Sequence, residues 1–267
     1  MSKGDSPGHP TLLIYVAVRV VYYRSRGLRN IVDSLREVHL QVRVVELGDV
    51  KVVVKEYGRE PGILKWAFIK ASTIPLQVYP FEVKPLNRLE REVRAFRKLR
   101  GFSTPRVILV DYRDALIARE FVEGTNDVEV VRKQLDRLGE VFSETHNYGY
   151  SLGDTKLDNI VYSERGDKWY VIDCEQAVSP ARPQAMIWDL LVFITSYLFA
   201  TLEKNVFALA GFREQMSVFL RSYLERSENR AEIARSAGTY LVKLVSSLML
   251  PYPLSRTFIE ALRSGST

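Results

Sequence analysis

The spacing of apolar residues changes once along the chain, and this change constrains the fold more than any other feature. Around residues 40–56, short valine-rich runs flank a Gly-Asp pair, which is typical of a β-hairpin. After Gly124 the apolar residues recur at helical spacing: Val128, Val131, Leu135, Leu138 and Phe142. We therefore expect an α+β protein with a strand-rich lobe at 1–124 and a helical lobe at 125–267.

The length and composition of the chain are those of a globular protein. The chain has 267 residues, 46% hydrophobic and 26% charged, which is long enough for two lobes with separate cores. A formal net charge of +6 suits an anionic partner such as a nucleotide, RNA or acidic lipid headgroups, although the surplus is modest. The single cysteine, Cys174, excludes an internal disulfide and a cysteine-rich metal site, and it fits the reducing cytoplasm.

Two apolar segments resemble targeting or membrane sequences. In the first, residues 11–23, Arg19 interrupts the run, Asp5 precedes it and no small-residue cleavage site follows, which favours a buried strand or helix over a signal peptide. The second, residues 190–202, is shorter than the 18 residues that a membrane span needs. We expect a cytoplasmic protein without a transmembrane span.

Further elements follow from local patterns. Residues 87–101 predict a helix that buries one apolar face and ends at Gly101 as its C-cap. Two alternating runs before Gly124 predict two more strands. Three long helical patterns fill 184–264, with Pro-Tyr-Pro at 251–253 as a breaker.

The stretch SLGDTKLDNIVY, residues 151–162, concentrates polar side chains ahead of an apolar run. Such density alone is typical of an exposed turn. However, NIVYSE and KWYVID can pair through the turn ERGDK, and that hairpin would bring Asn159 and Asp173 together at its open end. Amide and carboxylate oxygens are ligands that suit Mg²⁺. Asp154 would then remain free to act on a substrate hydroxyl.

These motifs carry a resemblance to a known group of enzymes. GDTKLDN resembles the catalytic loop of the protein-kinase-like superfamily, D-x-K-x-x-N, and VIDCE resembles its metal-binding D-F-G or D-F-E segment. The resemblance implies a bilobal kinase-like fold, with a small antiparallel sheet in the N-lobe and a helical C-lobe. It also implies roles: Asp154 as the catalytic carboxylate, Lys156 as a charge that neutralises the transferring phosphate, and Asn159 and Asp173 as Mg²⁺ ligands.

The resemblance extends upstream, in the order that the superfamily uses. VVVKEY offers Lys55 for the α- and β-phosphates of ATP, and REVRAF offers Glu92 as its helix partner. EFVEG is similar to the hinge that joins the lobes and holds adenine, which implies Glu120 and Val122 as cofactor contacts. Two alternatives stay open here. Lys55 is also compatible with an exposed edge-strand lysine, and Glu90 competes with Glu92.

The helix before the catalytic loop and the segment after the metal site also match. THNYGYSLGD is similar to the run that precedes the loop in small atypical kinases, which implies that His146 is a packing histidine. The interval from Asp173 to Asp189 is too short for an activation loop. The resemblance implies that Asp189 braces the catalytic loop.

Three departures narrow the subfamily. No glycine-rich loop precedes Lys55, Leu152 stands where the superfamily has a histidine, and Glu175 replaces the glycine of D-F-G. This pattern resembles compact atypical kinases: the RIO kinases, the kinase subunit of the KEOPS complex, and the lipopolysaccharide or Kdo kinases. The insertion at 58–85 is longer than usual and would cover the active site, dock a partner, or extend the small lobe.

Two functions from different classes remain. In the first, the protein is a Mg-ATP-dependent phosphotransferase that acts on a hydroxyl of a protein serine or threonine, a small molecule or a sugar. In the second, the missing glycine loop indicates a nucleotide-binding pseudokinase, or an ATPase, that acts as a scaffold for a protein or RNA complex. The retention of Asp154, Asn159 and Asp173 favours the first.

Overall fold

A computed structural model describes residues 41–48, 50–59 and 78–264. The N-terminal extension 1–40, and most of the insertion expected at 58–85, lie outside the described residues. The architecture is α+β, with a small antiparallel sheet and a mostly helical remainder, and of the described residues 54% are helical and 17% are in strands. Two compact units make up the chain. The first comprises Met1–Gly62 and Arg106–Phe121, and the second comprises Ile63–Pro105 and Val122–Thr267.

The first unit contains an antiparallel sheet with the strand order β1-β2-β4-β3. Its strands are β1 (Val42–Leu47), β2 (Val50–Glu56), β3 (Val107–Asp111) and β4 (Leu116–Glu120). The short helix η1 (Tyr57–Arg59) follows β2 directly. The predicted hairpin at 40–56 is therefore confirmed, and so are the two strands before Gly124. Gly48 has φ +62° in the hairpin turn, a conformation that glycine adopts without steric cost. Val52, Val54, Leu116 and Ala118 form the buried cluster of the sheet.

The helix predicted at 87–101 is α5 (Pro85–Lys98), in the second unit. Proline at its first turn favours a helix start there, because its missing N–H would be unpaired in any case. Gly101 was expected as the C-cap, but the helix ends before it. Gly101 instead has φ +84° in the following turn, where a Cβ would meet the carbonyl oxygen of Val141 at 2.6 Å. Close approach to helix α7 (Leu135–Asn147), which contains Val141, therefore explains this glycine.

The helix predicted at 128–146 is divided by Gln134, which has φ −128°. The two parts are α6 (Val128–Lys133) and α7 (Leu135–Asn147). All five apolar residues predicted to face the core are buried: Val128, Val131, Leu135, Leu138 and Phe142.

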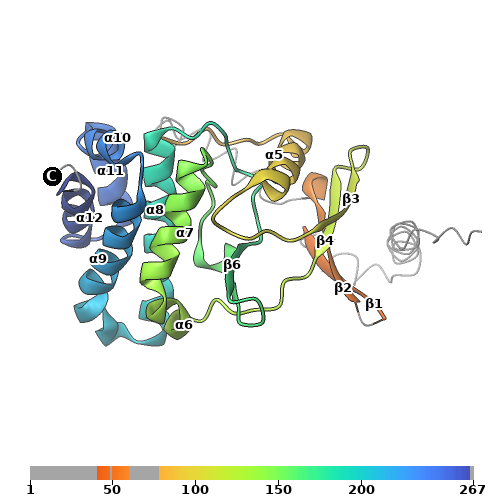
Figure 1. Ribbon diagram of the computed structural model, residues 1–267, viewed down its shortest axis with the longest axis horizontal. Coiled ribbons are helices and arrows are strands. Elements are labelled where there is room, and N and C mark those ends of the chain that lie inside the picture. The colour runs from red at the N-terminus through yellow and green to blue at the C-terminus, as the bar shows by residue number, and fades with distance from the viewer. Residues whose placement is uncertain (1–40, 49, 60–77, 265–267) are drawn as a thin grey trace, which may run out of the picture. The chain divides into compact units, whose positions relative to one another are not determined.

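The three helical patterns expected at 184–264 form five helices. These are α8 (Pro183–Lys204), α9 (Leu209–Arg226), α10 (Arg230–Ala237), α11 (Tyr240–Met249) and α12 (Leu254–Ser264), with η3 (Val206–Ala208) before α9. The Pro-Tyr-Pro breaker between α11 and α12 is confirmed. Figure 1 shows α7, α8 and α9 side by side, with α10, α11 and α12 grouped beyond them. The rings of Phe142, Phe193 and Phe219 meet between these helices, with centroids 4.8–5.4 Å apart.

Helix α8 is longer than its apolar stretch suggested. In the described part of the chain, it is the one helix long and apolar enough to cross a membrane by length and composition. However, 67% of its apolar window is buried inside the protein, as in the core helix of a soluble protein. The structure is compatible with a soluble protein.

Candidate active site

The predicted hairpin of NIVYSE and KWYVID is confirmed. Strands β5 (Ile160–Ser163) and β6 (Lys168–Val171) pair antiparallel, with Ile160 opposite Val171. Beyond that pair, the N–H of Ile172 donates to the carbonyl of Asn159 at 2.9 Å. The pairing therefore places Asn159 beside Ile172, the residue before Asp173, at the open end of the hairpin. Asn159 also ends the short helix η2 (Leu157–Asn159).

Asp189 organises the backbone that precedes the hairpin. Its carboxylate is fully buried and accepts the N–H of Leu152 at 2.6 Å and the N–H of Gly153 at 2.7 Å. The hydroxyl of Ser151 donates to the same carboxylate at 2.8 Å. A buried charge is tolerated when hydrogen bonds replace its lost hydration. The expected bracing role of Asp189 is thus confirmed.

His146 supports Asp189 from the adjacent helix. Its Nε2 lies 3.2 Å from the carboxylate of Asp189, and its Nδ1 lies 2.8 Å from the hydroxyl of Tyr223. Burial raises the pKa of Tyr223, which keeps the hydroxyl protonated and able to donate to Nδ1. In that arrangement Nε2–H donates to Asp189. His146 is therefore a buried packing and positioning residue, as the sequence indicated.

The loop from Ser151 to Gly153 is also held from the opposite side by Tyr79. The Tyr79 hydroxyl lies 3.1 Å from the carbonyl of Ser151 and 2.7 Å from that of Gln176. Gly153 has φ +81°, and a Cβ there would meet the Tyr79 ring at 2.6 Å. Only glycine satisfies both requirements. The position of the next residue, Asp154, is thus set by packing on both sides of the loop.

Asp154, Lys156 and Asn159 are in direct contact. The ammonium of Lys156 lies 3.1 Å from the carboxylate of Asp154, and the side-chain amide of Asn159 donates to the Asp154 carbonyl at 2.8 Å. Burial lowers the pKa of Lys156, but the charges of Asp154 and then Asp173, with the Asp154 hydrogen bond, raise it overall. Lys156 therefore carries a positive charge at neutral pH, within the electric field of both aspartates.

Carboxylates gather beside Asp173. One oxygen from each of Glu92, Asp173 and Glu175 lies within 4.8 Å of the others, and the two glutamates are buried. Like charges this close oppose ionisation unless cations compensate them. Arg88, fully buried, supplies one cation through an ion pair of 2.6 Å with Glu175. The oxygen-only donor set fits Mg²⁺, which prefers carboxylate ligands and retains several waters.

Arg88 and Glu175 were not expected as site residues. Glu175 was noted only as a replacement for glycine, and Arg88 was not singled out. A signal for Arg88 exists: it lies four residues before Glu92, on the same face of α5. Its partner on the segment after β6 is not visible from sequence spacing. Glu92 is buried and Glu90 is exposed, as helical periodicity indicated, and the role of Glu92 as the partner of Lys55 stays a prediction.

Lys55 belongs to the first unit, whereas Glu92, Asp154 and Asn159 belong to the second. It lies on β2, a central strand between β1 and β4, and its side chain is 1% exposed. Its ammonium is 5.0 Å from the centre of the Tyr57 ring. A solubilising lysine would be exposed on an edge strand. The alternative interpretation of Lys55 therefore does not fit.

Glu120 and Val122 flank the point where the chain passes between the units. Glu120 ends β4, and its carboxylate accepts the N–H of Arg106 at 3.1 Å. The boundary between the units falls between Phe121 and Val122. Beyond it, Thr125 exchanges two backbone hydrogen bonds with Tyr162, at 2.8 and 2.9 Å. The segment connects the two units, which is the connectivity that a hinge requires.

Comparison with known proteins adds no assignment to this geometry. A scan against models of known protein families finds no match to the chain, and a search of curated proteins finds none that is significant. The functional interpretation therefore depends on the arrangement of the chain's own residues.

Proposed function

We propose that this protein is a Mg-ATP-dependent phosphotransferase with a bilobal kinase-like fold, which transfers the γ-phosphate of ATP to a hydroxyl group. The observation that carries the proposal is the cluster at the open end of the β5–β6 hairpin. There Asp154, Lys156 and Asn159 are in contact, and Asp173 acts on the charge of Lys156. A catalytic carboxylate, a cation and oxygen ligands for a metal are the parts that phosphoryl transfer needs.

Each residue has a role in this proposal. Asp154 orients the acceptor hydroxyl and takes its proton as the oxygen bonds to phosphorus and ADP leaves. Lys156 offsets negative charge on the transferring phosphoryl group. Asn159 and Asp173 would hold Mg²⁺, which neutralises phosphate charge when bound. Lys55 is assigned to the α- and β-phosphates, and Glu92 to the orientation of that lysine.

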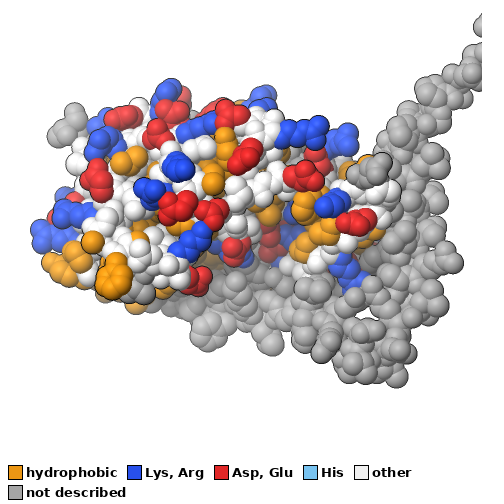
Figure 2. Space-filling view, turned by 90° about the horizontal axis from the view of Figure 1, so that it is seen from below, with side chains coloured by type: hydrophobic (Ala, Val, Ile, Leu, Met, Phe, Trp, Pro, Cys, Tyr) orange, Lys and Arg blue, Asp and Glu red, His pale blue; other side chains and the backbone are white. Residues whose placement is uncertain are grey.

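Other observations support the proposal less directly. The connection from Glu120 to Val122 supports an adenine-holding hinge, because it joins the two units. A single buried cysteine, Cys174, suits the cytoplasm, where ATP and Mg²⁺ are available. Lys and Arg side chains are interspersed with Asp and Glu on the face shown in Figure 2, which favours an enzyme over a scaffold with a continuous nucleic-acid surface there. The acceptor is a protein side chain or a small molecule.

Thermal unfolding with and without ATP and Mg²⁺ tests the nucleotide site. A ligand at 100 times its Kd stabilises the folded state by about 2.7 kcal/mol, which raises the unfolding midpoint by several degrees. We expect a rise that requires both ATP and Mg²⁺ and is lost in Asp173→Asn. Asp158→Asn is the matched control, because Asp158 is exposed in the same loop. A full rise in Asp173→Asn, or none in the native protein at millimolar ATP, would contradict the proposal.

The catalytic role of Asp154 is tested by a second variant. Asp154→Asn removes the proton acceptor but keeps the shape of the side chain, so we expect the Mg-ATP shift to remain. Turnover of labelled ATP should fall by about 10²- to 10⁴-fold, the usual contribution of general acid–base catalysis. Unchanged turnover in Asp154→Asn would show that this carboxylate does not act on the acceptor.

A further inference from the structure

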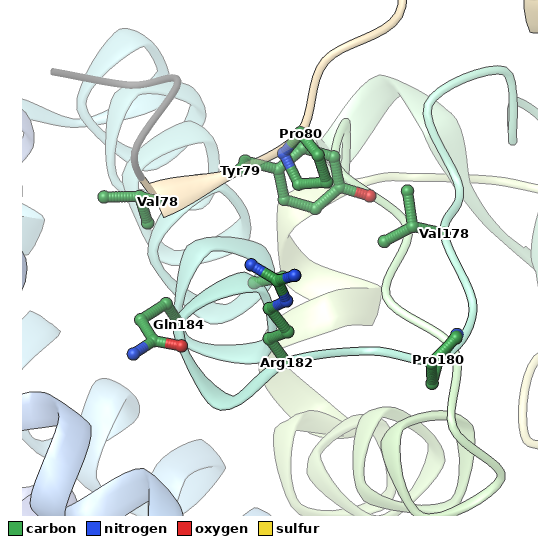
Figure 3. Close-up of a pocket in the computed structure, with 8 residues that line it drawn as sticks. Val78, Tyr79, Pro80, Val178, Pro180, Arg182 and Gln184 are labelled. Atoms are coloured by element: carbon green, nitrogen blue, oxygen red, sulfur yellow. The ribbon is translucent and has the colours of Figure 1, made fainter. Parts of the chain in front are cut away.

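A cavity of about 390 Å³ lies in the second unit, beside the first turn of α8. Figure 3 shows residues 78–80 on one side and the segment from Val178 to the start of α8 on the other. Most of its lining is apolar: Val78, Tyr79, Pro80, Val178, Pro180 and Ala185. Its volume falls in the range of small-molecule sites, toward the small end.

Two polar side chains complete the lining, Arg182 and Gln184. Among the residues that the structure describes, neither side chain has a hydrogen-bonding or ion-pair partner, and no acidic residue lines the cavity. Arg182 extends toward Tyr79 and Pro80 (Figure 3). A guanidinium group presents several N–H donors in one plane, which matches a phosphate or carboxylate. An apolar cavity with one available arginine therefore selects an organic anion.

The apolar walls are held in place by contacts outside the cavity. The Arg91 guanidinium donates to the carbonyl of Pro80 at 2.9 Å, which fixes this wall to α5. The nearest carboxylate along the chain, Glu82, is hydrogen-bonded to the backbone at the start of α5. The cavity is thus preformed, and a ligand would not have to order its walls.

The cavity is close to the proposed catalytic carboxylate. Its residue Val178 exchanges two backbone hydrogen bonds with Ser151, at 2.8 and 3.1 Å. Asp154 follows Ser151 by three residues, and three residues of extended chain span at most about 11 Å. The ring of Tyr79, which lines the cavity, also packs on Gly153, the neighbour of Asp154. The cavity wall is therefore in direct contact with the loop that carries Asp154.

We propose that this cavity binds the acceptor, and that the acceptor is a small hydroxylated organic anion, a phosphate ester or a carboxylate, held by Arg182 and Gln184. This inference rests on the proposed phosphotransferase function. The anionic group binds Arg182 while a hydroxyl elsewhere in the molecule reaches Asp154. That hydroxyl oxygen bonds to the γ-phosphorus, the bond from phosphorus to ADP breaks, and the proton passes to Asp154.

Binding without nucleotide tests the cavity independently of catalysis. The probes are glycerol 3-phosphate, ribose 5-phosphate and gluconate, each titrated by calorimetry against its neutral counterpart, glycerol, ribose or glucose. We expect at least one anion to bind, and its affinity to fall at least about tenfold in Arg182→Gln. Arg213→Gln is the matched control, because Arg213 is exposed on α9, away from the lining. It should bind like the native protein.

The outcomes separate this inference from the proposed function. Equal binding of neutral and anionic probes, unchanged affinity in Arg182→Gln, or no binding of any anion at 10 mM, taken as roughly the weak limit of specific binding, would overturn the anionic acceptor. If the Mg-ATP shift persists in those cases, the phosphotransferase proposal survives alone. Transfer of label from ATP to a bound anion would support both. Arginine-dependent binding in a protein without any Mg-ATP shift would overturn the acceptor role together with the proposed function.

Discussion

Asp189 is the residue on which the geometry of the loop from Ser151 to Gly153 depends most directly. Two consecutive backbone N–H groups, of Leu152 and Gly153, point at its two oxygens, and both bonds are short. Hydrogen bonds to a charged group contribute more than neutral ones, and a buried donor left unpaired is costly. The loop therefore adopts one conformation because a buried carboxylate satisfies its backbone.

We expect Asp189→Asn to lower the free energy of unfolding by about 3 kcal/mol or more. The side-chain NH2 group of asparagine would face a backbone N–H group, and two donors cannot form a hydrogen bond with each other. Urea denaturation measures this change. The control is Asp136→Asn, since Asp136 is exposed in the first turn of α7 and should change stability by less than about 1 kcal/mol. A loss at Asp189 no larger than at Asp136 would show that the loop does not need this brace.

At the scale of elements, the start of α5 is tied to the segment that follows Asp173. Glu82 accepts the N–H groups of Val83 and Lys84, both at 2.9 Å, which caps a helix whose own N-cap residue has no capping side chain. Gln176 then exchanges two hydrogen bonds with the Glu82 backbone, at 2.8 and 3.0 Å. Together with the ion pair of Arg88 and Glu175, these contacts join α5 to the segment that follows Asp173.

We expect the contribution of Glu82 to depend on pH. Burial alone would raise the pKa of Glu82, but hydrogen bonds from Lys84, Asn87 and Val83 lower it below its usual 4.5. A lowered pKa stabilises the folded state above the unfolded value, and this stabilisation is lost as pH falls through the folded value. Glu82→Gln should therefore cost about 1 kcal/mol at pH 7, and less below pH 4.5.

Urea unfolding at several pH values measures the Glu82 effect. Glu90→Gln is the control, because Glu90 is exposed on the same helix and should show no such dependence. A cost for Glu82→Gln that stays constant down to pH 3, about one unit below the usual glutamate pKa, would show that the charge of Glu82 does not cap α5.

At the scale of the whole molecule, α8 is the helix of the described residues that is long and apolar enough to cross a membrane. Phe193 is 0% exposed and packs on Phe142 and Phe219, whereas Phe199 on the same helix is 58% exposed. A helix in the core of a soluble protein tolerates a charged residue on its exposed face, at Phe199, but not on its buried face, at Phe193. A helix surrounded by lipid tolerates a charged residue at neither position, because moving an acidic side chain into lipid is energetically unfavourable.

We therefore expect Phe193→Asp to abolish soluble expression and Phe199→Asp to leave the amount of soluble protein and its unfolding midpoint nearly unchanged. Removal of a buried phenylalanine costs about 3–5 kcal/mol even before a charge is buried. Expression without detergent, followed by high-speed centrifugation, measures the soluble fraction. Equal loss of soluble protein in both variants would indicate that α8 contacts lipid.

The sequence predicted the elements better than their ends. The hairpin at 40–56, the strands of β5 and β6 and the buried face of α7 follow from local periodicity, which depends on residues close together in the chain. The break at Gln134, the early end of α5 and the division of 184–264 into five helices were not predicted. Helix ends depend on neighbouring elements, as the contact of Gly101 with α7 shows.

The sequence by itself determined the α+β class, the pairing of strands β5 and β6, and the burial of Glu92 rather than Glu90, because these depend on spacing along one or two adjacent segments. Only the tertiary structure decided that Lys55 is buried on a central strand, that Arg88 pairs with Glu175, and that Arg182 lines a cavity beside Ser151. Those facts depend on contacts between segments distant in the chain, and local patterns carry no information about such contacts.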